Sequence, residues 1–219
     1  MSEFCKSLIE RFYKISPYQD FDPTTYSPDI QGWGSYHPLF QEIIHSTKPQ
    51  LILEVGTWKG ASAIHMASLL RKENINGAII CIDTWLGGIE NLSDDKISGI
   101  NQLNHHGYPT LYYQFLANVI HSKVEDYIIP LPNTSNIMAK YLKSSHIQAD
   151  FIYIDGSHDE DDVYTDLNNY WQLLKPGGIM MGDDWYTGWY SVICAVNRFA
   201  KENQLEIAVT DEKWVLKKA

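Results

Sequence analysis

The sequence is short of cysteine, of positive charge and of long apolar runs. Its three cysteines, Cys5, Cys81 and Cys194, show no CxxC or zinc-finger spacing, so we expect reduced thiols in a cytoplasmic protein. Lysine and arginine number 17 against 27 aspartates and glutamates, a net charge of −10, which argues against nucleic acid or an anionic membrane as the main partner. No run approaches the roughly 20 apolar residues that span a bilayer.

After residue 50 the sequence alternates regularly between short apolar runs and helical segments. The apolar runs are continuous, as in strands buried on both faces, and cover 51–55, 78–82, 127–131, 151–154 and 178–181. Helical patterns lie between and after them, at 61–72, 110–121, 135–144, 160–173 and 189–203. Strands that alternate with helices of this length form a parallel sheet with helices on both faces.

The end of the chain departs from this alternation. Residues 205–209 and 213–216 flank a polar turn and predict an antiparallel hairpin at the sheet edge. The predicted fold class is therefore α/β: a doubly wound, mostly parallel, seven-stranded, Rossmann-like sheet with an antiparallel C-terminal hairpin.

Two further regions are expected to cover a substrate. Residues 1–48 contain two predicted helices and an aromatic-rich ordered loop, and we expect them to form a cap over the substrate or a contact between subunits. Residues 49–219 are expected to form the main globular unit. Within that unit, residues 86–109 form a long loop, a length that in a compact domain is usually functional or disordered.

A glycine turn follows the first predicted strand. Glu54, Gly56 and Gly60 have the spacing E-x-G-x-x-x-G, which differs from the dinucleotide pattern G-x-G-x-x-G and disfavours a nicotinamide dehydrogenase. The free N–H groups at the following helix start favour a carboxylate or phosphate, and Glu54 can pair with an ammonium group. Asp83, at the end of the next strand, can accept the hydroxyls of a ribose; the alternative is a helix cap or a solvated acid in a loop.

Acids and one histidine follow the fourth and fifth strands. Asp155 ends one strand, while Asp183 and Asp184 end the next, and adjacent parallel strands bring their ends together. Because three carboxylates repel one another, a divalent cation such as Mg²⁺ would relieve the repulsion, unless some of these acids simply cap helices. His158, three residues after Asp155, is a candidate general base, or else a surface histidine at a helix start.

Together these segments resemble the class I S-adenosylmethionine-dependent methyltransferases, and more narrowly the metal-assisted O-methyltransferases of the catechol and the bacterial sugar or macrolide types. The resemblance covers residues 40 to 218. It rests on LEVGTWKGASAIHMA, ICIDTW, PLPNTSNIMAKYL, FIYIDGSH and LLKPGGIMMGDDW.

The resemblance implies a set of site residues. The residues that it places around S-adenosylmethionine are Glu54, Gly56, Thr57, Trp58, Gly60, Ser62, Asp83, Thr84, Trp85, Thr134, Ser135 and Asp155. It makes Asp155, Asp183 and Asp184 the metal ligands, with Asp155 and His158 as the catalytic residues. The catechol type carries asparagine at the position of Asp184 and a lysine base at that of His158.

The function expected is divalent-metal-assisted methylation of a hydroxyl on a sugar or another small vicinal-diol metabolite. The negative charge suits a cationic cofactor, and metal chelation would lower the pKa of the acceptor hydroxyl. A homo-oligomer is expected, with no nucleic-acid or membrane partner. The alternative is a relative on the same fold that does not transfer methyl groups, either a protein linked to oxidative tailoring or hydroxylation or a cofactor-binding module.

Overall fold

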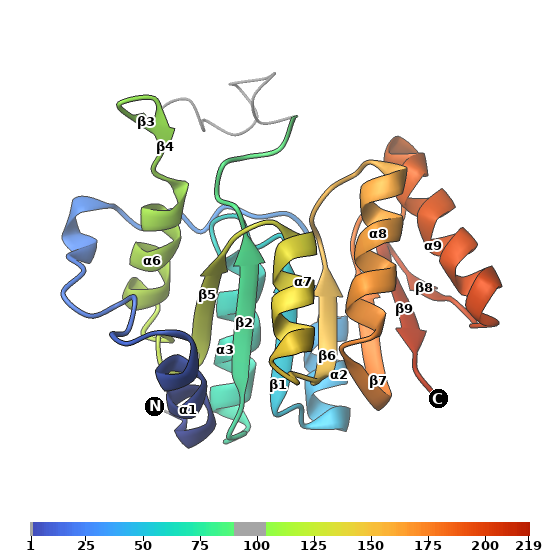
Figure 1. Ribbon diagram of the computed structural model, residues 1–219, viewed down its shortest axis with the longest axis horizontal. Coiled ribbons are helices and arrows are strands. Elements are labelled where there is room, and N and C mark those ends of the chain that lie inside the picture. The colour runs from blue at the N-terminus through green and yellow to red at the C-terminus, as the bar shows by residue number, and fades with distance from the viewer. Residues whose placement is uncertain (1, 90–103) are drawn as a thin grey trace.

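The computed structural model describes residues 2–89 and 104–219, and its centre is a seven-stranded sheet (Figure 1). The strand order is β5-β2-β1-β6-β7-β9-β8. The first five strands in that order are parallel, whereas β9 runs antiparallel to both β7 and β8. The strands are β1 (Leu51–Val55), β2 (Ala78–Asp83), β5 (Ile128–Pro132), β6 (Ala149–Ile154), β7 (Leu174–Gly182), β8 (Ala208–Thr210) and β9 (Lys213–Lys217).

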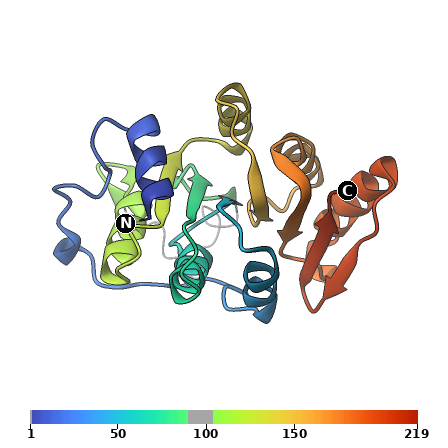
Figure 2. The ribbon, with the colours of Figure 1, turned by 90° about the horizontal axis from the view of Figure 1, so that it is seen from below.

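Helices cover both faces of this sheet, as Figure 2 shows from below. One face packs against α1 (Glu3–Phe12), α7 (Ser135–Ser144), α8 (Glu160–Trp171) and α9 (Tyr190–Asn203). The other packs against α2 (Pro38–Thr47), α3 (Ala61–Lys72) and α6 (Leu111–His121). Because successive strand residues point to opposite faces, every strand of this sheet except the exposed edge strand β8 contributes to both hydrophobic clusters, and the expected doubly wound α/β fold is confirmed.

Most of the expected strands differ from the observed ones by one or two residues at an end, and the largest differences are at β7 and β8. The strand β7 begins at Leu174 rather than at residue 178, since the Lys-Pro-Gly-Gly segment stays beside β6 across a register shift between Ala149 and Phe151. The turn chemistry of that segment therefore produces an irregular strand rather than a break. In the hairpin, β8 is limited to Ala208–Thr210.

The remaining described segments are short. Two 3₁₀ turns are η1 (Pro23–Thr25) and η3 (Thr187–Trp189), and a small hairpin joins β3 (Asn104–His105) to β4 (Tyr108–Pro109). Of the long loop expected over 86–109, residues 90–103 lie outside the described residues. Within the described ranges, no helix has both the length and the apolar character needed to cross a bilayer.

Residues 26–37 form what we call the strap, which crosses the carboxyl edge of the sheet between η1 and α2. Asn118 of α6 holds it through bonds from Nδ2 to the carbonyls of Asp29 (2.7 Å) and Lys59 (2.8 Å). The ammonium of Lys59 also pairs with Asp29 at 2.7 Å. Further along, Gln31 accepts a bond from the Trp58 indole at 2.9 Å. The loop expected to be ordered is thus fixed to the elements beneath it.

Candidate active site

A row of polar side chains crosses the sheet near its carboxyl edge, on the face covered by α2, α3 and α6. In the strand register Glu54 of β1 lies beside Cys81 of β2 on one side and Tyr153 of β6 on the other. Lys213, at the start of β9, extends the row. Because β9 is antiparallel, its first residue lies at the edge where the parallel strands end.

The glycine turn after β1 has a backbone that ordinary residues rarely adopt. Gly56, Trp58 and Gly60 have φ values of 81°, 51° and 90°. A Cβ on Gly56 would overlap the carbonyl of Asp155, because β6 passes directly beside the turn. Gly60 precedes the first residue of α3 and offers no side-chain cap, which leaves the helix start suited to an anionic group of a ligand.

Asp83 supports this turn from the end of β2. Its Oδ2 accepts the backbone N–H groups of Thr57 at 2.9 Å and Trp58 at 2.8 Å, and its Oδ1 accepts that of Trp85 at 2.7 Å. The backbone N–H of Thr84 also acts on this carboxylate, so a ribose hydroxyl would share its oxygens with the N–H groups of the turn. Burial raises the pKa of Asp83 despite these bonds.

Glu54 is a fully buried carboxyl with neutral donors. It accepts a hydrogen bond from the Ser62 hydroxyl, and the Cys81 thiol lies 3.5 Å from its Oε2. Burial raises the pKa of Glu54 to about 7, because no cation is among the groups that act on it. This arrangement leaves Glu54 suited to pair with a cationic group that binds nearby.

The other residues expected around the cofactor have different surroundings: Trp85 lies in the core, whereas Thr134 and Ser135 lie at the start of α7. The Trp85 indole is buried against Phe115 and donates to the Trp58 carbonyl at 2.8 Å, so the ring faces the core. Thr134 caps α7 through its hydroxyl. The carbonyl of Ser135 accepts a bond from the Tyr170 hydroxyl at 2.9 Å. The N-terminal end of α7 therefore lies at the carboxyl edge, as the motif requires.

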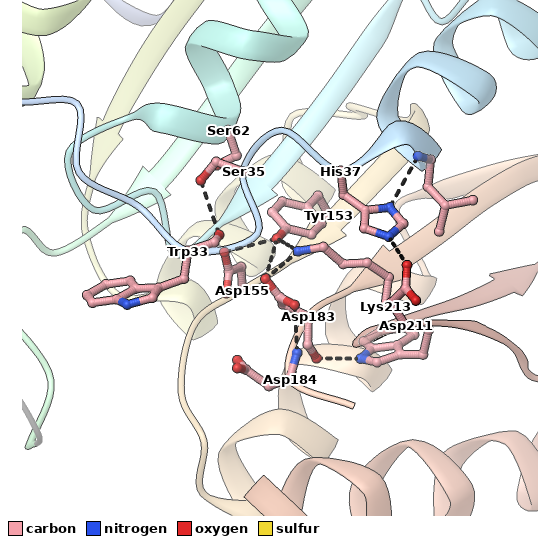
Figure 3. A network of polar contacts seen from close by, with 12 residues as sticks. Trp33, Ser35, His37, Ser62, Tyr153, Asp155, Asp183, Asp184, Asp211 and Lys213 are labelled. Carbon is pink, nitrogen blue, oxygen red and sulfur yellow. Dashed lines mark hydrogen bonds and ion pairs between the residues drawn. The ribbon is translucent and has the colours of Figure 1, made fainter. Parts of the chain in front are cut away.

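The acids after β6 and β7 form a cluster around Tyr153 (Figure 3). The Tyr153 hydroxyl lies 3.0 Å from Oδ2 of Asp155 and 3.1 Å from Oδ2 of Asp183. The Lys213 ammonium donates to the same hydroxyl at 2.8 Å and forms an ion pair with Asp183. Burial, followed by the charge of Asp183, raises the pKa of Asp155 well above its usual value, while Lys213 acts in the opposite direction.

Asp184 belongs to a separate pair. Its backbone has φ 67°, and its Oδ2 lies 3.0 Å from Nε2 of His158. The His158 ring is stacked on Trp189, with centroids 4.0 Å apart and planes 13° from parallel. About a quarter of the imidazole is exposed, so a fixed, partly accessible histidine–carboxylate pair lies beside the buried cluster.

Comparison with known proteins places this geometry in a family. A family model described as a methyltransferase domain matches residues 53–185, which is more than half of the chain and includes both the glycine turn and the acids. The chain belongs to this methyltransferase family. None of the curated protein sequences that were compared matches the chain.

Solved structures share the fold of this methyltransferase. An O-methyltransferase from Bacillus cereus, solved in complex with SAH, aligns with a TM-score of 0.59 and 12% identity over 99% of this chain and 90% of that one. The O-methyltransferase TomG from Streptomyces achromogenes, involved in tomaymycin synthesis and solved with SAM, aligns with a TM-score of 0.62 and 13% identity over 100% and 91%. The resemblance inferred from the motifs is thereby confirmed for family and fold.

A divalent metal does not fit the acids of this methyltransferase as they are arranged. Asp183 is paired with Lys213, and Asp184 is turned towards His158. Throughout residues 2–89 and 104–219, no group of three histidine, cysteine or acidic side chains is arranged to hold a metal ion. The structure brings together Asp155 and Asp183 as expected, but it does not join Asp184 to them as a third ligand.

Two residues of this site were not singled out by the sequence patterns. Tyr153 and Lys213 were assigned only to a strand and to the terminal hairpin. Tyr153 lies within the apolar run of β6, whereas Lys213 follows two acids as the first residue of β9, and each is almost completely buried. A charged residue that a strand pattern places on the core face is the signal that could have identified Lys213, because such a group needs a partner.

Proposed function

We propose that this protein is an S-adenosylmethionine-dependent O-methyltransferase that methylates a hydroxyl of a small molecule, a sugar or another vicinal diol, with His158 as the general base. The observation that carries this proposal is the His158–Asp184 pair, which follows the ends of β6 and β7 in a methyltransferase domain whose glycine turn contacts Asp155. The structures of similar fold that were solved with SAH and SAM support the choice of cofactor.

The cofactor supplies a methyl group carried on a sulfonium centre. The residues that would hold it are those of the glycine turn: the uncapped start of α3 for its carboxylate, Glu54 for its ammonium and Asp83 for its ribose. Glu54 is the buried carboxyl of this site whose hydrogen-bond partners are neutral donors, and the ammonium of the cofactor would supply the opposite charge.

His158 has the contacts of a general base. Asp184 lies 3.0 Å from Nε2 of the imidazole, which would take the proton of the acceptor hydroxyl. Asp184 then stabilises the imidazolium, and stacking on Trp189 fixes the ring plane. The expected divalent cation has no part in these steps, because the acids are paired within the chain. The expected homo-oligomer stays a prediction.

Two measurements test the proposal. Calorimetry with S-adenosylmethionine and with its demethylated product should show one binding site per chain. Release of that product should then accelerate with at least one member of a panel of sugars, polyols and catechols. His158→Ala should lower kcat by about 10²–10⁴-fold and leave cofactor binding unchanged.

A matched control is His45→Ala. His45 also lies 3.1 Å from a carboxylate, that of Glu73, but on the exposed surface, so its replacement should leave turnover unchanged. Absence of cofactor binding would contradict methyl transfer altogether. Cofactor binding with full turnover in His158→Ala would remove His158 from the mechanism while leaving the methyltransferase assignment in place.

A further inference from the structure

Lys213 is a buried lysine in the middle of an acid cluster, and its surroundings are unusual. Its side chain is 1% exposed, and the ammonium contacts the Tyr153 hydroxyl and the Asp183 carboxylate. The same nitrogen lies 5.7 Å from the ring centre of Phe40 and 5.1 Å from that of Tyr153, within the range of cation–π attraction. A buried charge persists only when it is paired, and here the ammonium has a carboxylate, a hydroxyl and two ring faces as partners.

The strap covers the ammonium of Lys213 and the carboxylate of Asp183. Gly34, with φ 56°, passes so near that a Cβ there would lie 2.7 Å from the Lys213 nitrogen and 2.9 Å from Oδ2 of Asp183. On the opposite side of the acids, towards Val163, Val192 and Trp214, the cavity that borders Asp155, Asp183 and Asp184 measures about 10 Å³, which is at most the room for a single water. Beside Lys213 itself, the close approach of Gly34 leaves no space for a cation that retains several of its own waters, as Mg²⁺ usually does.

We propose that the Lys213 ammonium is the resident cation of this acid cluster, and that it occupies the position where a divalent metal would otherwise balance Asp155 and Asp183. Lys213 is then a positioning residue: it holds Asp183 directly and orients the Tyr153 hydroxyl, which bonds Asp155. The consequence for turnover, that the reaction needs no divalent metal, rests on the proposed function. The consequence for metal binding does not.

The test is a titration of the purified full chain with Mn²⁺, followed by electron paramagnetic resonance and calorimetry. Wild-type protein should bind no stoichiometric Mn²⁺ at this site. Lys213→Met removes the charge and should create one Mn²⁺ site per chain with at least tenfold tighter binding. Lys213→Arg, which keeps a cation, should resemble wild type. Adding Asp183→Asn to Lys213→Met should abolish the new site.

Lys59→Met is the matched control. Lys59 is also a buried lysine paired with an aspartate, Asp29, but it lies away from the acid cluster, so its loss should create no Mn²⁺ site. A Lys213→Met protein that folds and still binds no Mn²⁺ contradicts the inference. If that variant does not fold, the titration of the wild-type protein tests the inference. Binding of one Mn²⁺ per wild-type chain that is lost in Asp183→Asn overturns the inference. Absence of stoichiometric Mn²⁺ binding by the wild type supports it.

Turnover gives an independent readout. If an acceptor is found, a chelator should leave the wild-type rate unchanged, and a rate that falls with the chelator and returns with Mg²⁺ would overturn the metal-independent reaction. If no acceptor is methylated, the proposed function fails, but the Mn²⁺ titration still tests Lys213.

Discussion

Glu54 and Asp183 are both buried carboxyls at the carboxyl edge of the sheet, on strands separated only by β6, yet their surroundings differ. Glu54 has neutral donors, Ser62 and Cys81, whereas Asp183 has the ammonium of Lys213. The region around Glu54 is built by the glycine turn and the adjoining strand. The region around Asp183 needs a residue from the last hairpin. The first region is therefore prepared for a cation that arrives with a ligand, and the second already contains its own.

The largest effect is expected from Gly56→Ala, which tests how tightly the glycine turn is packed. The positive φ and the overlap with the Asp155 carbonyl should together lower the free energy of unfolding by more than ~3 kcal/mol. Gly177→Ala is the matched control, since Gly177 has φ 78° with no atom within 4 Å of an added Cβ, and should cost about 1 kcal/mol. Urea unfolding measures both, and equal losses would show that the neighbouring strand does not constrain the turn.

The second effect concerns the absence of a cation at Glu54. Its pKa rises from 4.5 to about 7 on folding, so the unfolded chain loses this proton first. The wild-type free energy of unfolding should therefore fall as pH rises between these values, by up to ~3 kcal/mol. The free energy of unfolding of Glu54→Gln should not show this decline, so the variant should become more stable relative to wild type over the same pH range. Urea unfolding at several pH values measures this difference.

Glu73→Gln is the control of opposite sign. A hydrogen bond from Lys48 lowers the pKa of Glu73, so the wild-type carboxylate contributes stability above pH 4.5 that is lost as pH falls. The free energy of unfolding of Glu73→Gln should therefore fall furthest below that of the wild type at neutral pH. If Glu54→Gln and Glu73→Gln showed the same sign, the contrast between the two kinds of carboxyl would fail.

The smallest effect is expected at the centre of the acid cluster. Tyr153→Phe removes one hydroxyl and leaves Asp155 and Lys213 each with one partner fewer, which should cost about 1–3 kcal/mol. Tyr18→Phe loses a single bond, to the Ile128 carbonyl, and should cost about 1 kcal/mol. Thermal unfolding compares the two, and a smaller loss at Tyr153 would mean that its hydroxyl does not bridge the cluster.

The sequence predicted the sheet because its determinants are local. Continuous apolar runs, helix-length spacings and the glycine turn each lie within a few residues, and the structure reproduces all five parallel strands and the terminal hairpin. The pairing of the acids could not be predicted in the same way. Lys213 meets Asp183 only because β9 returns antiparallel to β7, and three acids at two strand ends are equally compatible with a metal.

The few residues of the strap between Gly32 and Ser35 touch both regions at once. Gly32 packs against Ala61 at the start of α3, and Gly34 lies on Lys213 and Asp183. A single short span of backbone therefore covers both the helix start suited to an anionic group and the ion pair between Lys213 and Asp183.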